Sequence, residues 1–167
     1  MSGVRYRRRG TAIVDTQCGI LLTAGRRGKS YILPGGGAKR GESRFLAALR
    51  ELTEETGLLP YAAEILFRHK GKVKTTRSGS HRFRDQHTVC LVKATGTPRP
   101  GGGDAQRIAY YYPGCNVRVS STTMEIIERY YEWKRQQPAE EFAVSDEDNE
   151  DTEDMEDGLG TDRDDDE

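Results

Sequence analysis

The sequence has few of the features that mark secreted, membrane-spanning or metal-thiolate proteins. Only three of its 167 residues are cysteines, and no metal-ligand spacing surrounds them. It contains no run of about 18 apolar residues to span a bilayer, and its start, MSGVRYRRRG, lacks the apolar stretch of a secretory signal. We therefore expect a soluble cytoplasmic protein without a membrane partner, with Cys18 and Cys90 reduced and in or near the core.

Apolar residues are also scarce, and the charge is unevenly distributed. Hydrophobic residues make up 34% of the chain and charged residues 32%, which does not suit a uniformly packed globule. Residues 138–167 hold 16 Asp and Glu and one Arg, a net charge of −15, whereas residues 1–137 carry a net charge of +14. Segments with high net charge and few apolar residues are typically disordered. We therefore expect a folded domain at residues 1–137 and a disordered acidic tail at residues 138–167.

The apolar pattern alternates between strand-like and helical stretches. Residues 10–14 and 19–24 are short apolar runs with a turn between them, which predicts a β-hairpin. The next apolar run, at residues 31–33, is stopped by Pro34 and three glycines, so a loop is expected there. Further strands are predicted around residues 63–69, 87–93 and 108–112, and helices over residues 43–56 and 120–137. This order indicates an α/β fold in which helices pack on a mixed β-sheet.

The helix predicted over residues 43–56 carries its acids on one face. At about 100° per residue, three glutamates share an arc of roughly 100°: Glu51, Glu54 and Glu55. Apolar residues fall on roughly the opposite side: Phe45, Leu49 and Leu52. An ordinary amphipathic helix with a solvated acidic side would show the same pattern. Clustered like charges are unfavourable, however, and a bound hard cation with oxygen ligands would explain why the glutamates lie together.

The segment at residues 36–58 reads GGAKRGESRFLAALRELTEETGL. Five residues separate Gly36 from Glu42, and seven more separate Glu42 from the run RELTEETGL that starts at Arg50. This segment resembles the Nudix box, the signature of the Nudix hydrolases, at every defining position, and a pattern that fixes so many residues is far more specific than a lone glycine motif. The resemblance implies a Nudix-like α/β/α sandwich with a mixed β-sheet, and metal-dependent hydrolysis of a phosphoanhydride bond.

The resemblance also implies a metal site on the acidic helix face. Glu51 and Glu55, one helical turn apart, are the expected ligands of Mg²⁺, with Mn²⁺ as a substitute, and Glu54 is a third ligand or a partner of the ligands. The backbone carbonyl of Gly35 is expected to add another oxygen. Mg²⁺ suits such a site because it keeps several waters and binds through few carboxylates plus substrate phosphates.

The catalytic candidates surround this site. Glu54 is the first candidate for the general base, and Asp104, which follows a glycine-rich run, is the second; Asp104 is equally well explained as a polar turn residue. Arg50 lies beside Glu54 on the helical wheel and is expected to pair with the carboxylates and hold their rotamers. Glu42, just before the helix, is expected to bind metal or to orient the cluster.

The basic residues favour an anionic substrate, because clustered positive charge attracts polyanions. Candidate substrate contacts are five bases and one tyrosine that could stack on a nucleobase: Arg27, Lys39, Arg40, Arg82, Arg84 and Tyr110. The expected partner is a small, highly anionic phosphorylated substrate: a nucleoside diphosphate derivative, a dinucleoside polyphosphate or an inositol pyrophosphate. The 5′ end of RNA is a further candidate.

The alternative function is a catalytically idle Nudix-fold module that binds nucleotides or RNA. Degenerate modules usually lose box carboxylates, and Glu51, Glu54 and Glu55 are all present here, so an enzyme is favoured. Many members of the family dimerise and a homodimer is compatible with the resemblance, but the sequence identifies no interface.

Overall fold

The computed structural model describes residues 3–102 and 105–138. The chain divides into two units, Met1–Gln137 and Pro138–Glu167. The predicted acidic tail lies, apart from Pro138, outside the described residues. The helices and strands of the first unit are β1 (Arg5–Ile13), β2 (Asp15–Thr16), β3 (Gly19–Ala24), β4 (Gly35–Gly37), α1 (Arg44–Thr56), β5 (Leu59–Thr75), β6 (Arg82–Thr95), β7 (Arg107–Tyr111) and α2 (Ser121–Gln136).

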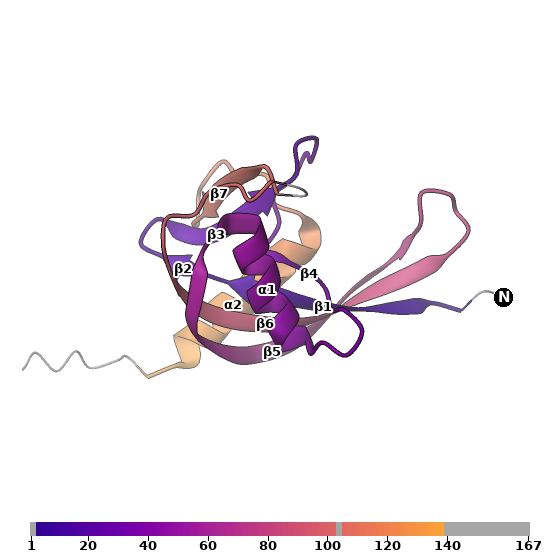
Figure 1. The fold of residues 1–167 in the computed structure, drawn as a ribbon, viewed down its shortest axis with the longest axis horizontal. Coiled ribbons are helices and arrows are strands. Elements are labelled where there is room, and N and C mark those ends of the chain that lie inside the picture. The colour runs from indigo at the N-terminus through magenta and orange to yellow at the C-terminus, as the bar shows by residue number, and fades with distance from the viewer. Residues whose placement is uncertain (1–2, 103–104, 139–167) are drawn as a thin grey trace, which may run out of the picture. The chain divides into compact units, whose positions relative to one another are not determined.

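The strands form two sheets between the two helices (Figure 1). One sheet has the order β4-β1-β6-β5 and the other the order β2-β3-β7. Strands β1 and β6 run parallel, whereas β4 and β5 each pair with a neighbour in the antiparallel direction. The four-stranded sheet is therefore mixed, and the predicted α/β/α sandwich is confirmed.

The core has two sides because successive strand residues point to opposite faces of a sheet. In β1, Ala12 packs in the cluster that contains Leu52 of α1, whereas the next residue, Ile13, packs in the cluster that contains Ile126 and Ile127 of α2. The same division runs through β3, where Leu21 faces the α1 side and its two neighbours face the α2 side. Each helix is thus held to the sheets by its own apolar layer.

Three strands project beyond the helices as a basic arm, at the right of Figure 1. We use "basic arm" for residues 5–9, 69–75 and 82–87. Here β1 pairs in parallel with β6, from Arg5 opposite Phe83 to Arg9 opposite His87, and β6 pairs antiparallel with β5. The strand predicted to begin at residue 10 therefore begins five residues earlier. The basic stretch between the two predicted later strands is the end of a long hairpin.

The glycine run after Pro34 was expected to be a loop, but it forms the short strand β4. Gly35 lies opposite Thr11 of β1, and Gly36 lies opposite Gly10. The apolar run at residues 31–33 forms no continuous strand, since Tyr31 and Ile32 make only isolated bridges. The pairings between β1 and β4 join residues about 25 positions apart, so the local signal of Pro and Gly could not predict them.

The two cysteines differ in their environment. Cys90 is buried in the α1-side core, as expected. Cys18 is exposed, because it lies in the turn between β2 and β3, and the expectation that it packs in or near the core is wrong. None of the helices in the described ranges is long and apolar enough to cross a membrane.

Candidate active site

Helix α1 begins and ends where its capping residues predict. The hydroxyl of Ser43 accepts a hydrogen bond from the Leu46 N–H at 3.0 Å. At the other end Gly57 adopts φ +73°, and its N–H donates to the Thr53 carbonyl. Leu52 is fully buried, and Phe45 and Leu49 pack against the same core layer. The apolar face is therefore turned to the sheet, which leaves the acids on the other side.

Arg50 is the centre of the acidic face. Its Nε lies 2.8 Å from Glu42 Oε1. Its Nη1 lies 2.8 Å from Glu51 Oε1 and 3.0 Å from Glu54 Oε2. Its Nη2 donates to the Gly37 carbonyl of β4 at 3.1 Å. One guanidinium thus joins three carboxylates and ties the helix to the edge strand of the sheet.

The charges of this network are mutually stabilising. The hydrogen bonds from Arg50, and then the Lys39 N–H, lower the pKa of Glu42 to about 2. The same pairing with Glu42, followed by that with Glu51, raises the pKa of Arg50 above its usual value although partial burial opposes the charge. Glu42 is therefore ionised at neutral and at mildly acidic pH.

Strand β4 brings backbone, without side chains, against the carboxylates of α1. A Cβ on Gly36 would lie 2.3 Å from the Cδ and Oε1 atoms of Glu51, so only glycine leaves room for this carboxylate. One residue earlier, the Gly35 N–H donates to Glu55 Oε2 at 3.1 Å. Glu51 and Glu55, one turn apart on the helix, are thus both held against the same three-residue strand.

The donor set on this face consists of oxygen atoms, which suits Mg²⁺ or Mn²⁺ better than a thiolate-binding metal. No group of three or more His, Cys, Asp or Glu side chains in the described part of the chain is arranged so that it could hold a metal ion by itself. In this structure the Arg50 guanidinium forms ion pairs with both Glu51 and Glu54. A metal at this face would be bound by two or fewer of these carboxylates together with backbone oxygen, water and phosphate, which is the coordination that Mg²⁺ favours.

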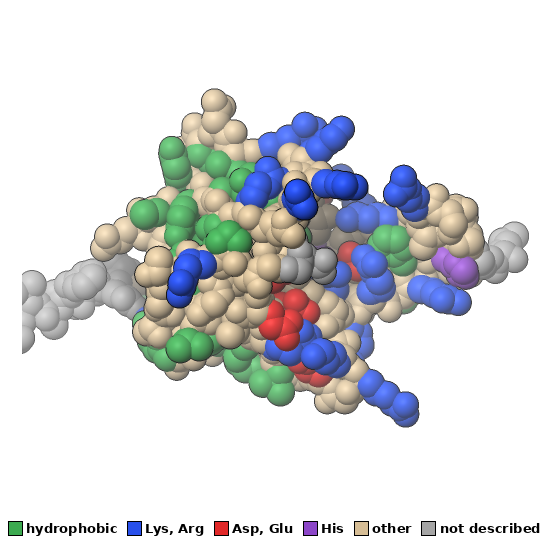
Figure 2. Space-filling view, turned by 45° about the horizontal axis from the view of Figure 1, so that its top comes forward, with side chains coloured by type: hydrophobic (Ala, Val, Ile, Leu, Met, Phe, Trp, Pro, Cys, Tyr) green, Lys and Arg blue, Asp and Glu red, His purple; other side chains and the backbone are tan. Residues whose placement is uncertain are grey.

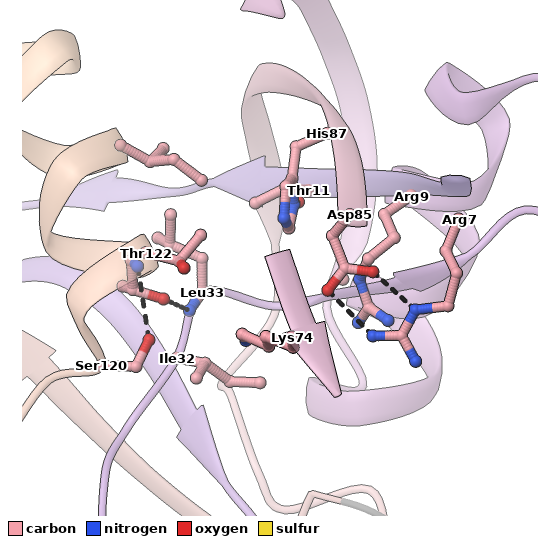
Figure 3. A pocket seen from close by; sticks show the side chains of 13 residues that line it. Arg7, Arg9, Thr11, Ile32, Leu33, Lys74, Asp85, His87, Ser120 and Thr122 are labelled. Atoms are coloured by element: carbon pink, nitrogen blue, oxygen red, sulfur yellow. Dashed lines mark hydrogen bonds and ion pairs between the residues drawn. The ribbon is translucent and has the colours of Figure 1, made fainter. Parts of the chain in front are cut away.

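A cavity of about 220 Å³ lies on the α2 side of the sheet (Figure 3). It meets the carboxylate face at Gly35, which lines the cavity and also contacts Glu55. Its polar walls come from β1, β5, β6 and the start of α2: Arg7, Arg9, Thr11, Lys74, Asp85, His87, Ser120, Thr122 and Thr123. No predicted substrate residue is among the described residues that line it.

Two residues of the cavity have strongly perturbed environments. Asp85 is buried, which by itself would raise its pKa, but two hydrogen bonds from Arg7, at 2.7 and 2.9 Å, and the charges of Arg9 and Arg7 lower it overall. His87 is 9% exposed, and burial together with the charge of Arg9 lowers its pKa to about 4. Near neutral pH the cavity therefore contains an ionised Asp85 and a neutral His87.

Comparisons with known proteins agree with this architecture. A family model of the NUDIX domain matches residues 5–113. A solved structure from Chromobacterium violaceum, assigned to the nudix hydrolase family, is 35% identical, covers 83% of this chain and 84% of its own, and has a TM-score of 0.65. The chain belongs to the Nudix family. No curated protein matches it.

Two more distant solved structures share the Nudix fold. The NUDIX domain of Shewanella oneidensis NrtR, solved with ADP-ribose, is 15% identical with a TM-score of 0.58, over 80% of this chain and 90% of that one. A bifunctional NMN adenylyltransferase/ADP-ribose pyrophosphatase from Francisella tularensis, solved with AMP and a Mn ion, is 20% identical with a TM-score of 0.58, over 80% of this chain and 43% of that one. The family and fold predicted from the sequence are confirmed, and membership of the family supports the predicted pyrophosphohydrolase.

The loop before β7 completes the Nudix helix at its C-terminal end. The Arg99 N–H donates to the Thr56 carbonyl, and the Gly101 N–H donates to the Glu55 carbonyl, both at 2.8 Å. These bonds satisfy carbonyls that the last helical turn leaves without partners. Asp104, the second candidate base, lies outside the described residues.

The predicted substrate contacts of this Nudix domain are scattered. Lys39 and Arg40 are exposed in the turn before α1, and Arg27 is exposed in the turn after β3. Arg82 and Arg84 lie on the basic arm, where the Arg84 Nε donates to the Gly71 carbonyl at 2.8 Å. Tyr110 is partly buried against the α1-side core, which favours a packing role over base stacking. Figure 2 shows a cluster of Asp and Glu side chains in red, bordered by Lys and Arg side chains in blue that continue along the basic arm.

Of the residues that line the cavity, Arg7 and Arg9 are the two that the sequence could have predicted. They belong to the basic run RYRRR, and alternate residues of a strand share a face, so a strand there would point both arginines the same way. Asp85, His87 and Lys74 gave no such signal, because only the pairing of β1, β6 and β5 brings them beside those arginines.

Proposed function

We propose that this Nudix protein hydrolyses the phosphoanhydride bond of a nucleoside diphosphate derivative or a related polyanion, using a divalent cation held by Glu51 and Glu55 with the Gly35 carbonyl. The observation that supports this most directly is the arrangement of α1 against β4, in which both carboxylates lie against the glycines of the edge strand. When bound, such a cation stabilises charge on phosphate oxygens and lowers the pKa of a water.

The side chains around this site have separable tasks. Arg50 holds Glu42, Glu51 and Glu54 in place, so the carboxylates do not repel one another out of position. Glu54 is the most exposed of the three, with 53% of its side chain accessible, and in this proposal it takes the proton of the attacking water. The cavity beyond Gly35 accepts part of the substrate that is not cleaved.

A catalytically idle binding module is the alternative. It would have no need to keep three carboxylates on one guanidinium beside a glycine strand, because like charges at such distances are costly unless they are paired or used. ADP-ribose in one structural relative, and AMP with Mn in another, make adenosine diphosphate derivatives the first substrates to try.

The test is hydrolysis of a panel of compounds by the full chain in Mg²⁺ or Mn²⁺, with products identified by chromatography. The panel contains ADP-ribose, dinucleoside polyphosphates, an inositol pyrophosphate and 5′-triphosphorylated RNA. We expect metal-dependent turnover of at least one compound, and a fall in kcat of roughly 10²-fold or more for Glu54→Gln, which removes the proton acceptor.

The matched control is Glu128→Gln, an exposed glutamate on α2 that is remote in the sequence from the box. It should leave kcat unchanged. Calorimetric titration with Mn²⁺ provides a second measurement, in which Glu51→Gln and Glu55→Gln weaken binding and Glu128→Gln does not. Binding of these ligands with no metal-dependent turnover of any compound would identify the idle module instead.

A further inference from the structure

The cavity beside Gly35 carries more positive charge than the groups around it neutralise. Three cations and one carboxylate line it, a net charge of +2, since His87 is neutral near pH 7. Arg7 is already committed: it forms two hydrogen bonds with Asp85, and its guanidinium lies 3.8 Å from the centre of the Phe83 ring. Arg9 and Lys74, in contrast, form no ion pair within the described ranges.

Lys74 reaches this cavity because the hairpin is irregular. Lys70 lies opposite Gln86, and Lys74 lies opposite Phe83, with a register shift between Lys70 and Val73. An even spacing along a regular strand would put both lysines on one face. The bulge turns Lys74 to the opposite face, so that it lines the same cavity as Arg9. Figure 3 shows Lys74 extending from the strand toward Ile32 and Leu33, across the cavity from the Arg7–Asp85 pair.

The cavity also contains a polar group without a partner. The Nδ1 atom of His87 is 2.8 Å from the Thr11 hydroxyl, whereas its Nε2 is buried and has no hydrogen-bond partner among the described residues. An unsatisfied buried polar atom is unfavourable and is rare in native proteins. If the Thr11 hydroxyl donates to Nδ1, the Nε2 atom carries the ring proton. Nε2 is then a hydrogen-bond donor, as are the side chains of Arg9 and Lys74.

We propose that this cavity binds a second phosphate group, one carried by the part of the substrate that is not cleaved, through Arg9 and Lys74. The inference deepens the proposed function and rests on it for the position of the scissile bond. With about 220 Å³, the cavity is smaller than the roughly 300–1,000 Å³ of pockets that enclose a whole ligand, so it suits one group of a larger substrate. Two unpaired cations in a partly enclosed site select a phosphate over a neutral sugar or base.

The test uses pairs of compounds that differ by one phosphate. Coenzyme A is compared with 3′-dephospho-coenzyme A, and 2′-phospho-ADP-ribose with ADP-ribose, as substrates of the full chain. We expect the phosphorylated member of a pair to have the higher kcat/KM. Arg9→Gln and Lys74→Gln should each lower that preference roughly tenfold, which is the loss expected for one charge-assisted contact. Lys70→Gln, on the opposite face of the same strand, should leave it unchanged.

Binding to the metal-free protein separates this inference from the proposed function. In the presence of EDTA, calorimetry compares the affinity of the protein for adenosine 3′,5′-bisphosphate with its affinity for adenosine 5′-monophosphate. Inositol hexakisphosphate is a third probe, which carries phosphates without a nucleoside. Binding that depends on Arg9 and Lys74 supports the site, and the probe that shows it identifies the carrier of the phosphate. If both variants lower the affinity for the two members of every pair equally, or lower neither affinity, the cavity is not a phosphate site. This conclusion holds even when ADP-ribose is hydrolysed normally.

Discussion

The close approach of Glu51 to Gly36 predicts that one added methyl group disables the site. In Gly36→Ala the new Cβ would lie 2.3 Å from both Cδ and Oε1 of Glu51 and 2.8 Å from its Oε2. Ordinary contact begins near 3.4 Å, so the carboxylate must move by about 1 Å or adopt another rotamer. Either change also disturbs the 2.8 Å ion pair between Glu51 and Arg50.

The expected loss is large for activity and small for stability. A displacement of about 1 Å in a positioned catalytic group costs on the order of 10²-fold in rate. The atoms in the way are the end of a flexible side chain rather than backbone, and a Gly to Ala change at an accessible φ reduces the entropy of the unfolded chain. The free energy of unfolding should therefore change by less than about 1 kcal/mol.

Gly37→Ala is the matched control, because a Cβ at Gly37 would meet nothing within 4 Å. Both variants and the native chain are compared in kcat on the best compound of the panel, in calorimetric Mn²⁺ affinity, and in thermal unfolding. A Gly36→Ala variant that keeps both its kcat and its Mn²⁺ affinity within about threefold of the native values would contradict this prediction.

Three further predictions concern charge. Arg50→Gln should raise the pKa of Glu42 from about 2 toward its ordinary value, since the hydrogen bond from Arg50 is the largest cause of the shift; carbon-detected NMR titration measures this, and an unmoved pKa contradicts the assignment. The pKa of His87 is about 4 in the folded chain against 6.5 in the unfolded chain, so the unfolded chain binds the proton first as the pH falls. The stability that the neutral ring contributes should be fully present above pH 6.5 and about 3 kcal/mol lower by pH 4. Urea unfolding measures the free energy of unfolding at each pH, and this free energy should depend less on pH in His87→Gln than in the native chain or in His81→Gln. An equal pH dependence in all three proteins would contradict the prediction. Deleting residues 138–167, which carry a net charge of −15, should lower the apparent KM for polyanions at low salt if the tail competes with substrate, whereas an equal KM would exclude competition.

The Nudix helix could be predicted almost to the residue because its signals are local. Ser43 and Gly57 cap it, and the spacing of Leu49 and Leu52 against Glu51 and Glu55 determines which face is buried. A helix is stabilised by contacts three or four residues apart, so its sequence contains most of the information on its limits and its faces. One short segment therefore predicts which acids share a face of the helix, and with them the reaction class.

The surroundings of that helix required the tertiary structure. The glycines after Pro34 become strand β4 only because β1 lies beside them, and Gly36 has its effect only because Glu51 meets it from a helix 15 positions further along. Lys74 and Arg9 line the same cavity because of a bulge in a hairpin and a parallel pairing across more than 70 residues. Strand register and sheet order depend on such distant partners, and a shift of one residue reverses every side chain. The sequence thus determined the chemistry of the Nudix box, and the pairing of the strands decided which charges stand next to it.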